Sequence, residues 1–242
     1  MMAKDKLIVA LDVDTRKEAE KIISQLQDVV GWFKVGMQLY YGAGPGIIDF
    51  VHRSGAKVFL DLKLMDIPNT VAHAARALTR YHADIFNVHA SGGMEMMSRA
   101  AEAVHDEASR LGISPPLIVG VTLLTSISRE VLNQQIGIPG SAEETVIRWA
   151  KMCAEAGMDG AVASGREARA IKNNTNLGVI ITPGIRPSGE AGTDDQKRVL
   201  TPGQAIEQGA THLVVGRPIT KAAFPRDAAV GILEEIKNSL VK

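Results

Sequence analysis

The sequence predicts an α/β fold in which residues 1–242 form a single (β/α)8 barrel with parallel strands. Three observations predict this fold class. The chain has 242 residues, close to the roughly 250 that such a barrel needs. Short apolar runs alternate with longer helix-forming stretches along the whole chain. These runs are almost continuously apolar, which is typical of parallel strands buried on both faces.

The elements follow in order from this alternation. We expect eight strands, at residues 7–11, 32–35, 57–62, 85–88, 117–121, 160–163, 179–182 and 212–215. Helical periodicity predicts amphipathic helices at 15–26, 70–81, 94–111, 142–156 and 227–240. Gly55, Gly157 and Gly209 follow helical stretches, where glycine suits a left-handed cap. The alternative is an open doubly wound sheet, for which eight strands are unusually many. Because no Pro- or Ser-rich linker divides the chain, we expect one closed TIM barrel.

Charge and cysteine content exclude several classes of function. Lys plus Arg and Asp plus Glu each total 27, so no positive field would attract nucleic acid or an anionic membrane. The first apolar run is too short for a signal peptide, and no run reaches the ~18 residues of a spanning helix. Cys153 is the only cysteine and is expected to be a buried structural thiol. The sequence therefore predicts a cytoplasmic protein.

Charged residues cluster where the first three predicted strands end. Asp61 and Lys63 end the third strand, Asp12 follows the first and Lys34 lies in the second. The carboxyl ends of barrel strands form the rim that carries active sites. Because burying charges is costly, we expect an alternating array that performs metal-free chemistry. The alternative is a structural ion pair that fills the barrel.

Asp66 lies just beyond this cluster, in the segment Asp-Ile-Pro-Asn-Thr. We group Asp66 with Asp61 and Lys63 as a candidate catalytic residue. The same segment is also good helix-start chemistry, so the alternative role for Asp66 is to cap the following helix.

Two loops predict a phosphate site. Gly184 and Arg186 follow the seventh strand, and Gly216 and Arg217 follow the eighth. Barrels commonly bind phosphate at these two loops, where glycine exposes backbone N–H groups and arginine grips two oxygens. The irregular segment 183–197 is a candidate lid over this site.

Other motifs are missing or incomplete. Segment 42–46 is glycine-rich but lacks the last glycine of the dinucleotide fingerprint, so we expect a loop there. The six histidines show no metal-ligand spacing, and His89 is expected to be structural. No Gly-x-Ser-x-Gly nucleophile motif is present. We therefore expect neither a metal nor a cofactor.

Three motifs together resemble the orotidine 5′-phosphate decarboxylase family, most closely its bacterial branch. They are the stretch from Asp61 to Thr70, Pro-Gly-Ile-Arg-Pro at 183–187 and Val-Val-Gly-Arg-Pro at 214–218. The resemblance covers almost the whole chain. It implies cofactor-independent conversion of orotidine 5′-monophosphate to uridine 5′-monophosphate, the last step of de novo UMP biosynthesis. It also implies a homodimer in which Asp66 and Thr70 enter the neighbouring subunit's site.

The resemblance also implies a role for each matching residue. Lys63 would stabilise the carbanion and protonate C6, while Asp61 would crowd the departing carboxylate and Asp66 would hold the ammonium. The substrate-binding residues would be Asp12, Lys34 and Thr70 for ribose, Thr125 and Pro183 for the pyrimidine, Arg186, Arg217 and Gly216 for phosphate, and Gln196 between phosphate and base.

Three other functions remain open from the sequence. One is a magnesium-dependent sugar-phosphate decarboxylase or lyase of the same superfamily, because the Asp-x-Lys-x-x-Asp pattern is shared. Another is a Schiff-base aldolase with Lys63 as nucleophile, which the flanking aspartates disfavour by keeping that lysine protonated. The third is a phosphate-ligand sensor without catalysis.

Overall fold

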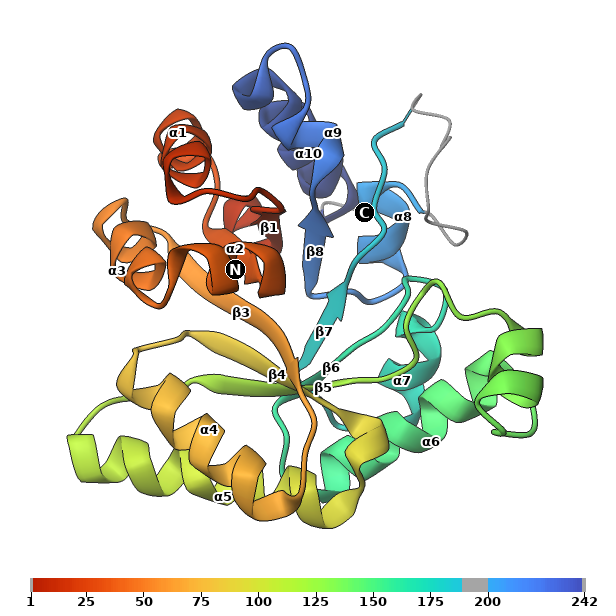
Figure 1. Cartoon of the computed structure of the whole chain (residues 1–242). Helices are drawn as coiled ribbons and strands as arrows, with labels where there is room; N and C mark the ends of the chain where they lie inside the picture. The colour runs from red at the N-terminus through yellow and green to blue at the C-terminus, as the bar shows by residue number, and fades with distance from the viewer. Residues whose placement is uncertain (1, 189–199, 241–242) are drawn as a thin grey trace.

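The computed structural model describes residues 2–188 and 200–240, and its parallel strands close into a barrel (Figure 1). Closure occurs because β1 (Leu7–Ala10) pairs with both β2 (Trp32–Gly36) and β8 (His212–Val215). The strands between them follow in sequence order: β3 (Lys57–Leu64), β4 (Ile85–His89), β5 (Leu117–Val121), β6 (Gly160–Val162) and β7 (Val179–Thr182). The predicted (β/α)8 barrel is confirmed, and the open sheet is excluded.

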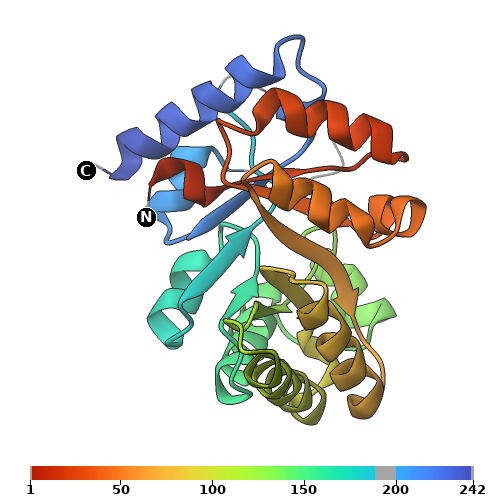
Figure 2. The ribbon, with the colours of Figure 1, turned by 90° about the vertical axis from the view of Figure 1, so that its left-hand side faces the viewer.

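Helices surround the strands on the outside of the barrel (Figure 2). The α-helices are α1 (Arg16–Leu26), α2 (Met37–Ala43), α3 (Gly46–Arg53), α4 (Pro68–Arg80), α5 (Met94–Leu111), α6 (Ala142–Glu155), α7 (Ala168–Asn174), α8 (Pro202–Glu207), α9 (Arg217–Thr220) and α10 (Pro225–Leu240). Short helical turns also occur at η1 (Ala3–Lys6), η2 (Ala90–Gly92) and η3 (Val131–Gln135). The five predicted helices are all present, and α4 begins earlier than predicted because Pro68 suits the first helical turn.

The loop predicted at residues 42–46 is wrong. Gly42 lies inside α2, and Gly46 opens α3, so only Gly44 and Pro45 connect the two helices. Gly44 has φ 70°, in the left-handed region that glycine enters without steric cost. The glycine-rich composition therefore marks a sharp break between two helices.

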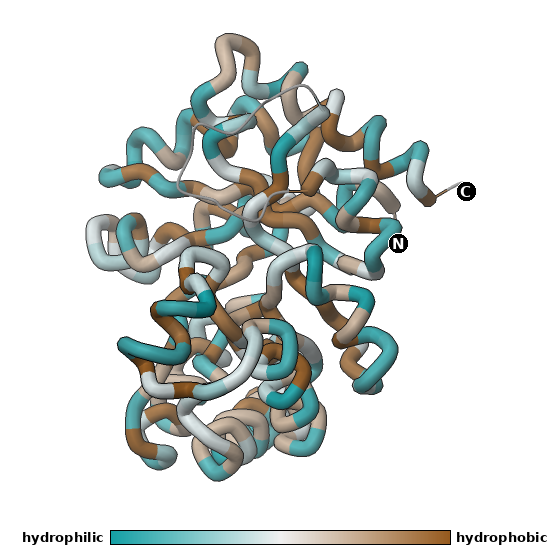
Figure 3. The backbone as a smooth tube through the Cα atoms, turned by 90° about the vertical axis from the view of Figure 1, so that its right-hand side faces the viewer, coloured by the Kyte–Doolittle hydropathy of each residue, from teal (hydrophilic) through white to brown (hydrophobic). Residues whose placement is uncertain are grey.

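The core has an inner and an outer layer. Inside the barrel, Ile8, Trp32, Phe59, Ile85 and Val119 belong to one buried cluster. A larger cluster lies between the strands and the helices, and Figure 3 shows many hydrophobic stretches in the interior and hydrophilic ones toward the outside. Cys153 is buried in this outer layer, and burial raises the pKa of its thiol to about 12. It is the structural thiol that the sequence predicts.

An irregularity interrupts β3 just before the active rim. Leu60 pairs with Phe86 and Leu64 with Val88, so the step from residue 60 to 64 on β3 matches the step from 86 to 88 on β4. Lys63 lies in this bulge with φ 53°, a region that residues with a Cβ rarely adopt. Regular alternation of side chains along β3 therefore does not extend to Lys63.

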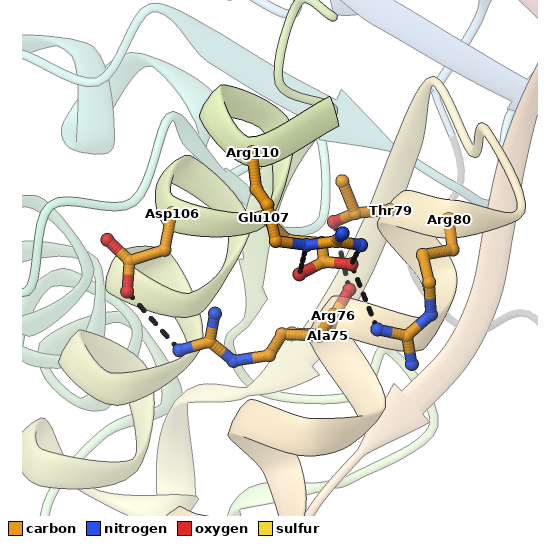
Figure 4. A network of polar contacts seen from close by, with 7 residues as sticks. All are labelled: Ala75, Arg76, Thr79, Arg80, Asp106, Glu107 and Arg110. Atoms are coloured by element: carbon orange, nitrogen blue, oxygen red, sulfur yellow. Dashed lines mark hydrogen bonds and ion pairs between the residues drawn. The ribbon is translucent and has the colours of Figure 1, made fainter. Parts of the chain in front are cut away.

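Ion pairs join α4 to α5 on the side of the barrel (Figure 4). The Glu107 carboxylate, whose side chain is 5% exposed, accepts hydrogen bonds from Arg80 at 2.9 Å and from Arg110 at 2.6 Å. Arg76 pairs with the exposed Asp106 at 3.2 Å. These contacts fix α4, whose first turn carries Thr70, against its neighbour.

The first and last described elements meet near the closure of the barrel. The helix α10 packs beside α1 and α8, and it also contacts the turn η1 (Figure 2). Within residues 2–188 and 200–240, the structure contains no helix with the length and apolar character to span a bilayer.

Candidate active site

Four charged side chains form a continuous chain at the carboxyl ends of β1, β2 and β3. The Lys34 ammonium lies 3.0 Å from Asp12 Oδ1 and 3.3 Å from Asp61 Oδ2. The Lys63 ammonium lies 2.7 Å from Asp61 Oδ1. The structure thus brings together the four residues that the sequence places at three strand ends. It does so through the bulge in β3, which turns Lys63 back toward Asp61.

Burial and charge compete within this array. Burial raises the pKa of Asp61, but Lys34 and Lys63, together with hydrogen bonds to the carboxylate, outweigh it and lower the pKa overall. Burial lowers the pKa of Lys34, but Asp61 and Asp12 more than offset this and raise it. Both groups are therefore charged at neutral pH, and the array places opposite charges side by side.

Asn87 is a member of the site that the sequence reasoning missed. It lies on β4, is 1% exposed, and donates from Nδ2 to Asp61 Oδ1 at 2.8 Å. Its Oδ1 accepts a hydrogen bond from the Lys63 backbone N–H at 2.8 Å. The signal was available, because Ile85 and Asn87 are two residues apart and so point to the same barrel interior. A polar side chain at that interior position needs a partner.

A cavity of about 250 Å³ opens beside the Lys63 ammonium. Its walls are mainly apolar, from Phe59, Val121 and Leu123 among others, and Lys34, Asp61 and Lys63 lie at its polar end. Thr125 and Pro183, the two residues predicted to border the pyrimidine, also line this cavity. The site can hold a flat group against a fixed cation.

A second cavity of about 220 Å³ continues from the first across Lys34, Asp61 and Pro183. Its lining includes the residues predicted for the phosphate site from the loops after the seventh and eighth strands: Gly184, Arg186, Gly216 and Arg217. Asp12 also lines it. The loops after β7 and β8 therefore meet at one place, with two guanidinium groups about one cavity.

The ends of the candidate lid lie close together. The Arg186 backbone N–H donates to the Leu200 carbonyl at 3.0 Å, and Ser188 binds Glu235 on α10. The intervening Gln196, expected between phosphate and base, lies outside the described residues.

Asp66 and Thr70 do not join the charge array of their own chain. Both are exposed, and the Asp66 carboxylate accepts a hydrogen bond from the next residue, the Ile67 backbone N–H, at 2.6 Å. Ile67 is the residue preceding α4, and its side chain makes no cap, so Asp66 is not the helix cap considered from the sequence. Met65 and Ile67 on either side are 57% and 66% exposed.

Two further residues border the array. A Cβ at Gly36 would lie 3.0 Å from Lys34 Nζ, so glycine there leaves room for the ammonium. His89 ends β4 half-buried, and burial followed by the Lys63 charge lowers the pKa of its imidazole. His89 is therefore neutral beside the cationic site at neutral pH.

Comparison with known proteins identifies the family of this chain. A model of the orotidine 5′-phosphate decarboxylase / HUMPS family matches residues 5–232. The chain belongs to this family. The resemblance inferred from the three motifs is thereby confirmed.

Individual members of the family align with this chain almost end to end. Orotidine 5′-phosphate decarboxylase of Moorella thermoacetica is 50% identical over 98% of this chain and 94% of its own length. The enzyme of that name from Syntrophomonas wolfei is 47% identical over 98% of this chain and 100% of its length. The crystal structure of orotidine 5′-phosphate decarboxylase from Lactobacillus acidophilus superposes with a TM-score of 0.84 at 38% identity, covering 96% and 99% of the two chains.

Proposed function

We propose that the protein decarboxylates orotidine 5′-monophosphate to uridine 5′-monophosphate, the last step of de novo pyrimidine nucleotide synthesis, in the cytoplasm. The observation that carries the proposal is the Lys63 ammonium, paired with Asp61 at 2.7 Å, at the polar end of an apolar cavity. Family membership and near end-to-end alignment with enzymes of that name support the choice of substrate.

In this proposal the reaction needs only a fixed cation. The bond between C6 and the carboxylate breaks, its electron pair stays on C6, and carbon dioxide leaves. The Lys63 ammonium stabilises this charge and transfers a proton to C6, then regains a proton from solvent. Asp61 crowds the substrate carboxylate and, with Asp66 of the neighbouring subunit, holds Lys63. No metal or cofactor takes part.

The remaining groups bind the substrate. Arg186, Arg217 and Gly216 hold the phosphate and Gln196 bridges it to the base. Asp12, Lys34 and the neighbour's Thr70 bind the ribose, and Thr125 and Pro183 border the pyrimidine. Phosphate is remote from C6, so its binding energy serves to close segment 183–197 over the base.

The test is loss of substrate absorbance in excess chelator, for wild type, Lys63→Ala and Lys57→Ala. Lys57 lies at the opposite end of β3, over the Trp32 ring, and is the matched control. We expect chelator-resistant turnover by wild type and Lys57→Ala, and at least about a thousandfold loss in Lys63→Ala, since a charge-stabilising group is removed. Lys63→Ala should still bind uridine 5′-monophosphate. Full activity in Lys63→Ala, or loss with chelator, contradicts the proposal; the latter outcome favours a magnesium-dependent lyase acting on sugar phosphates.

A further inference from the structure

Asn87 has no part in the reaction as proposed above, yet its side chain contacts both residues at the centre of it. One amide group donates to the Asp61 carboxylate and accepts from the Lys63 backbone, each at 2.8 Å. The residue is 1% exposed, and it is not among the residues that line the cavities of the site. Asn87 is therefore placed to act through its neighbours, without touching the substrate.

The backbone of Lys63 depends on this amide. Lys63 has φ 53°, and the bulge in β3 takes its N–H out of the regular strand pairing. Asn87 Oδ1 supplies the acceptor for this N–H in a partly buried position. The left-handed turn in turn carries the Lys63 ammonium back to Asp61, which lies two residues earlier.

The orientation of Asp61 depends on the other end of the same amide. Asp61 Oδ1 accepts from both Lys63 Nζ and Asn87 Nδ2, while Oδ2 faces Lys34. The two ammonium groups sit on long side chains, whereas the Asn87 amide sits on a short side chain that is buried on β4. The amide is thus the rigid member of the set of donors about this carboxylate.

We propose that Asn87 is a positioning residue for decarboxylation, which holds the Asp61 carboxylate and the left-handed turn at Lys63 in the arrangement that the reaction uses. The inference rests on the proposed function, because it concerns the same site. Small displacements of reacting groups have large effects on rate, so loss of Asn87 should affect the chemical step more than binding.

Asn87→Leu keeps the size of the side chain and removes both hydrogen bonds. We expect kcat to fall by about 10- to 100-fold, while KM and the Kd for uridine 5′-monophosphate stay within about threefold, because the phosphate and ribose groups are untouched. Thr79→Val is the matched control, since Thr79 is fully buried and its hydroxyl donates to the Ala75 carbonyl within α4. A wild-type kcat in Asn87→Leu overturns the proposal, and so does an equal loss of kcat and product affinity.

Asn87→Asp separates the two hydrogen bonds. It keeps the acceptor for the Lys63 N–H and places a carboxyl oxygen opposite Asp61. Two facing carboxyl groups share a proton, and the protonated form restores a donor to Asp61. The groups that face this pair are Lys34 on β2, Lys63 on β3 and His89 on β4, with Asp12 reached through Lys34.

We therefore expect the kcat of Asn87→Asp, relative to wild type, to rise as pH falls through the titration of the new pair. If the ratio of the Asn87→Asp kcat to the wild-type kcat does not change with pH, the proposal is overturned. This test does not require Asn87→Leu to fold. Wild-type protein without turnover refutes the proposed function instead. Carboxyl NMR of Asp61 without substrate distinguishes failure of the positioning role from failure of the proposed function. Removal of the Asn87 donor should raise the pKa of Asp61. An unchanged pKa overturns the positioning role.

Discussion

At the scale of single residues, the site consists of charges that are stable because each has a partner. Asp61 contacts two ammonium groups and one amide, and Lys34 contacts two carboxylates. The four charges could be predicted from sequence, because each interrupts or follows an apolar strand. Asn87 escaped notice because a neutral side chain inside a strand gives a weaker signal than a buried charge. The bulge at Lys63 could not be predicted, because no glycine or proline marks the turn.

His212 provides a prediction at this scale. It lies at the start of β8, 3% exposed, with Nδ1 2.9 Å from the Thr211 hydroxyl and its ring against the edge of Trp32. Burial, and then the Lys6 charge, lower the pKa of His212 from 6.5 to about 4. Between pH 6.5 and about 4, His212 is therefore protonated in the unfolded chain but neutral in the folded protein. The free energy of unfolding falls as pH falls through this range.

Urea unfolding of wild type and His212→Phe at pH 7 and pH 4 tests this. The variant keeps a ring against Trp32 but cannot titrate. We expect wild type to lose more unfolding free energy than the variant on acidification, by a few kcal/mol at most, roughly 1.4 kcal/mol for each unit of pKa shift. Parallel losses in the two proteins would show that His212 does not titrate in this window.

At the scale of elements, the helix positions followed from periodicity, and the exceptions have local causes. The segment 37–53 is two short helices broken at Gly44, and neither is long enough to show a periodic pattern reliably. The start of α4 depends on Pro68, whose preference for the first turn overrides the polar residues that follow. The pairing of α4 with α5 through Glu107 could not be predicted, because it depends on how two separate helices pack.

Glu107 gives the prediction for these elements. Hydrogen bonds from Arg110 and Arg80 lower the pKa of Glu107 to about 2, so its stabilising effect is present above the ordinary value of 4.5 and is lost as pH falls toward 2. Glu107→Gln should lower the Tm at pH 7 by about 1–3 degrees, because a shielded carboxylate loses its charge while both guanidinium partners stay half-exposed to solvent. Asp106→Asn is the control, since Asp106 is exposed and makes one ion pair. Calorimetry at pH 7 decides; equal Tm values for the two variants contradict the role of Glu107.

At the scale of the whole molecule, the described chain holds most of the proposed site but not all of it. Asp66 and Thr70 are exposed on the rim. Asp66 lies between the exposed apolar residues Met65 and Ile67, and Thr70 lies in the first turn of α4. A second copy of the chain would cover this apolar surface, as proposed from the family resemblance. The closed barrel could be predicted from eight apolar runs, whereas assembly rests on the resemblance alone.

Mixing two inactive variants tests this shared site. In a dimer of Lys63→Ala with Asp66→Ala, one of the two sites would contain both native residues. Random 1:1 reassortment should then restore about one quarter of the wild-type activity, because half of the dimers are mixed and each carries one intact site. Activity assays after mild dissociation and remixing measure this. Absence of any recovery, with mixed dimers confirmed by mass, would mean that each subunit works alone.

The bulge in β3 also bears on protein design. Since the Lys63 backbone N–H in this turn donates to Asn87 on the next strand, a graft of Asp61 and Lys63 alone would leave that N–H without its acceptor. Transplanting this chemistry onto another eight-stranded scaffold would require the whole βαβ module of residues 57–89, including the bulge by which β3 has more residues than β4 between paired positions. The Asp61–Lys63 pair is thus a property of two neighbouring strands, to which β1 and β2 add Asp12 and Lys34.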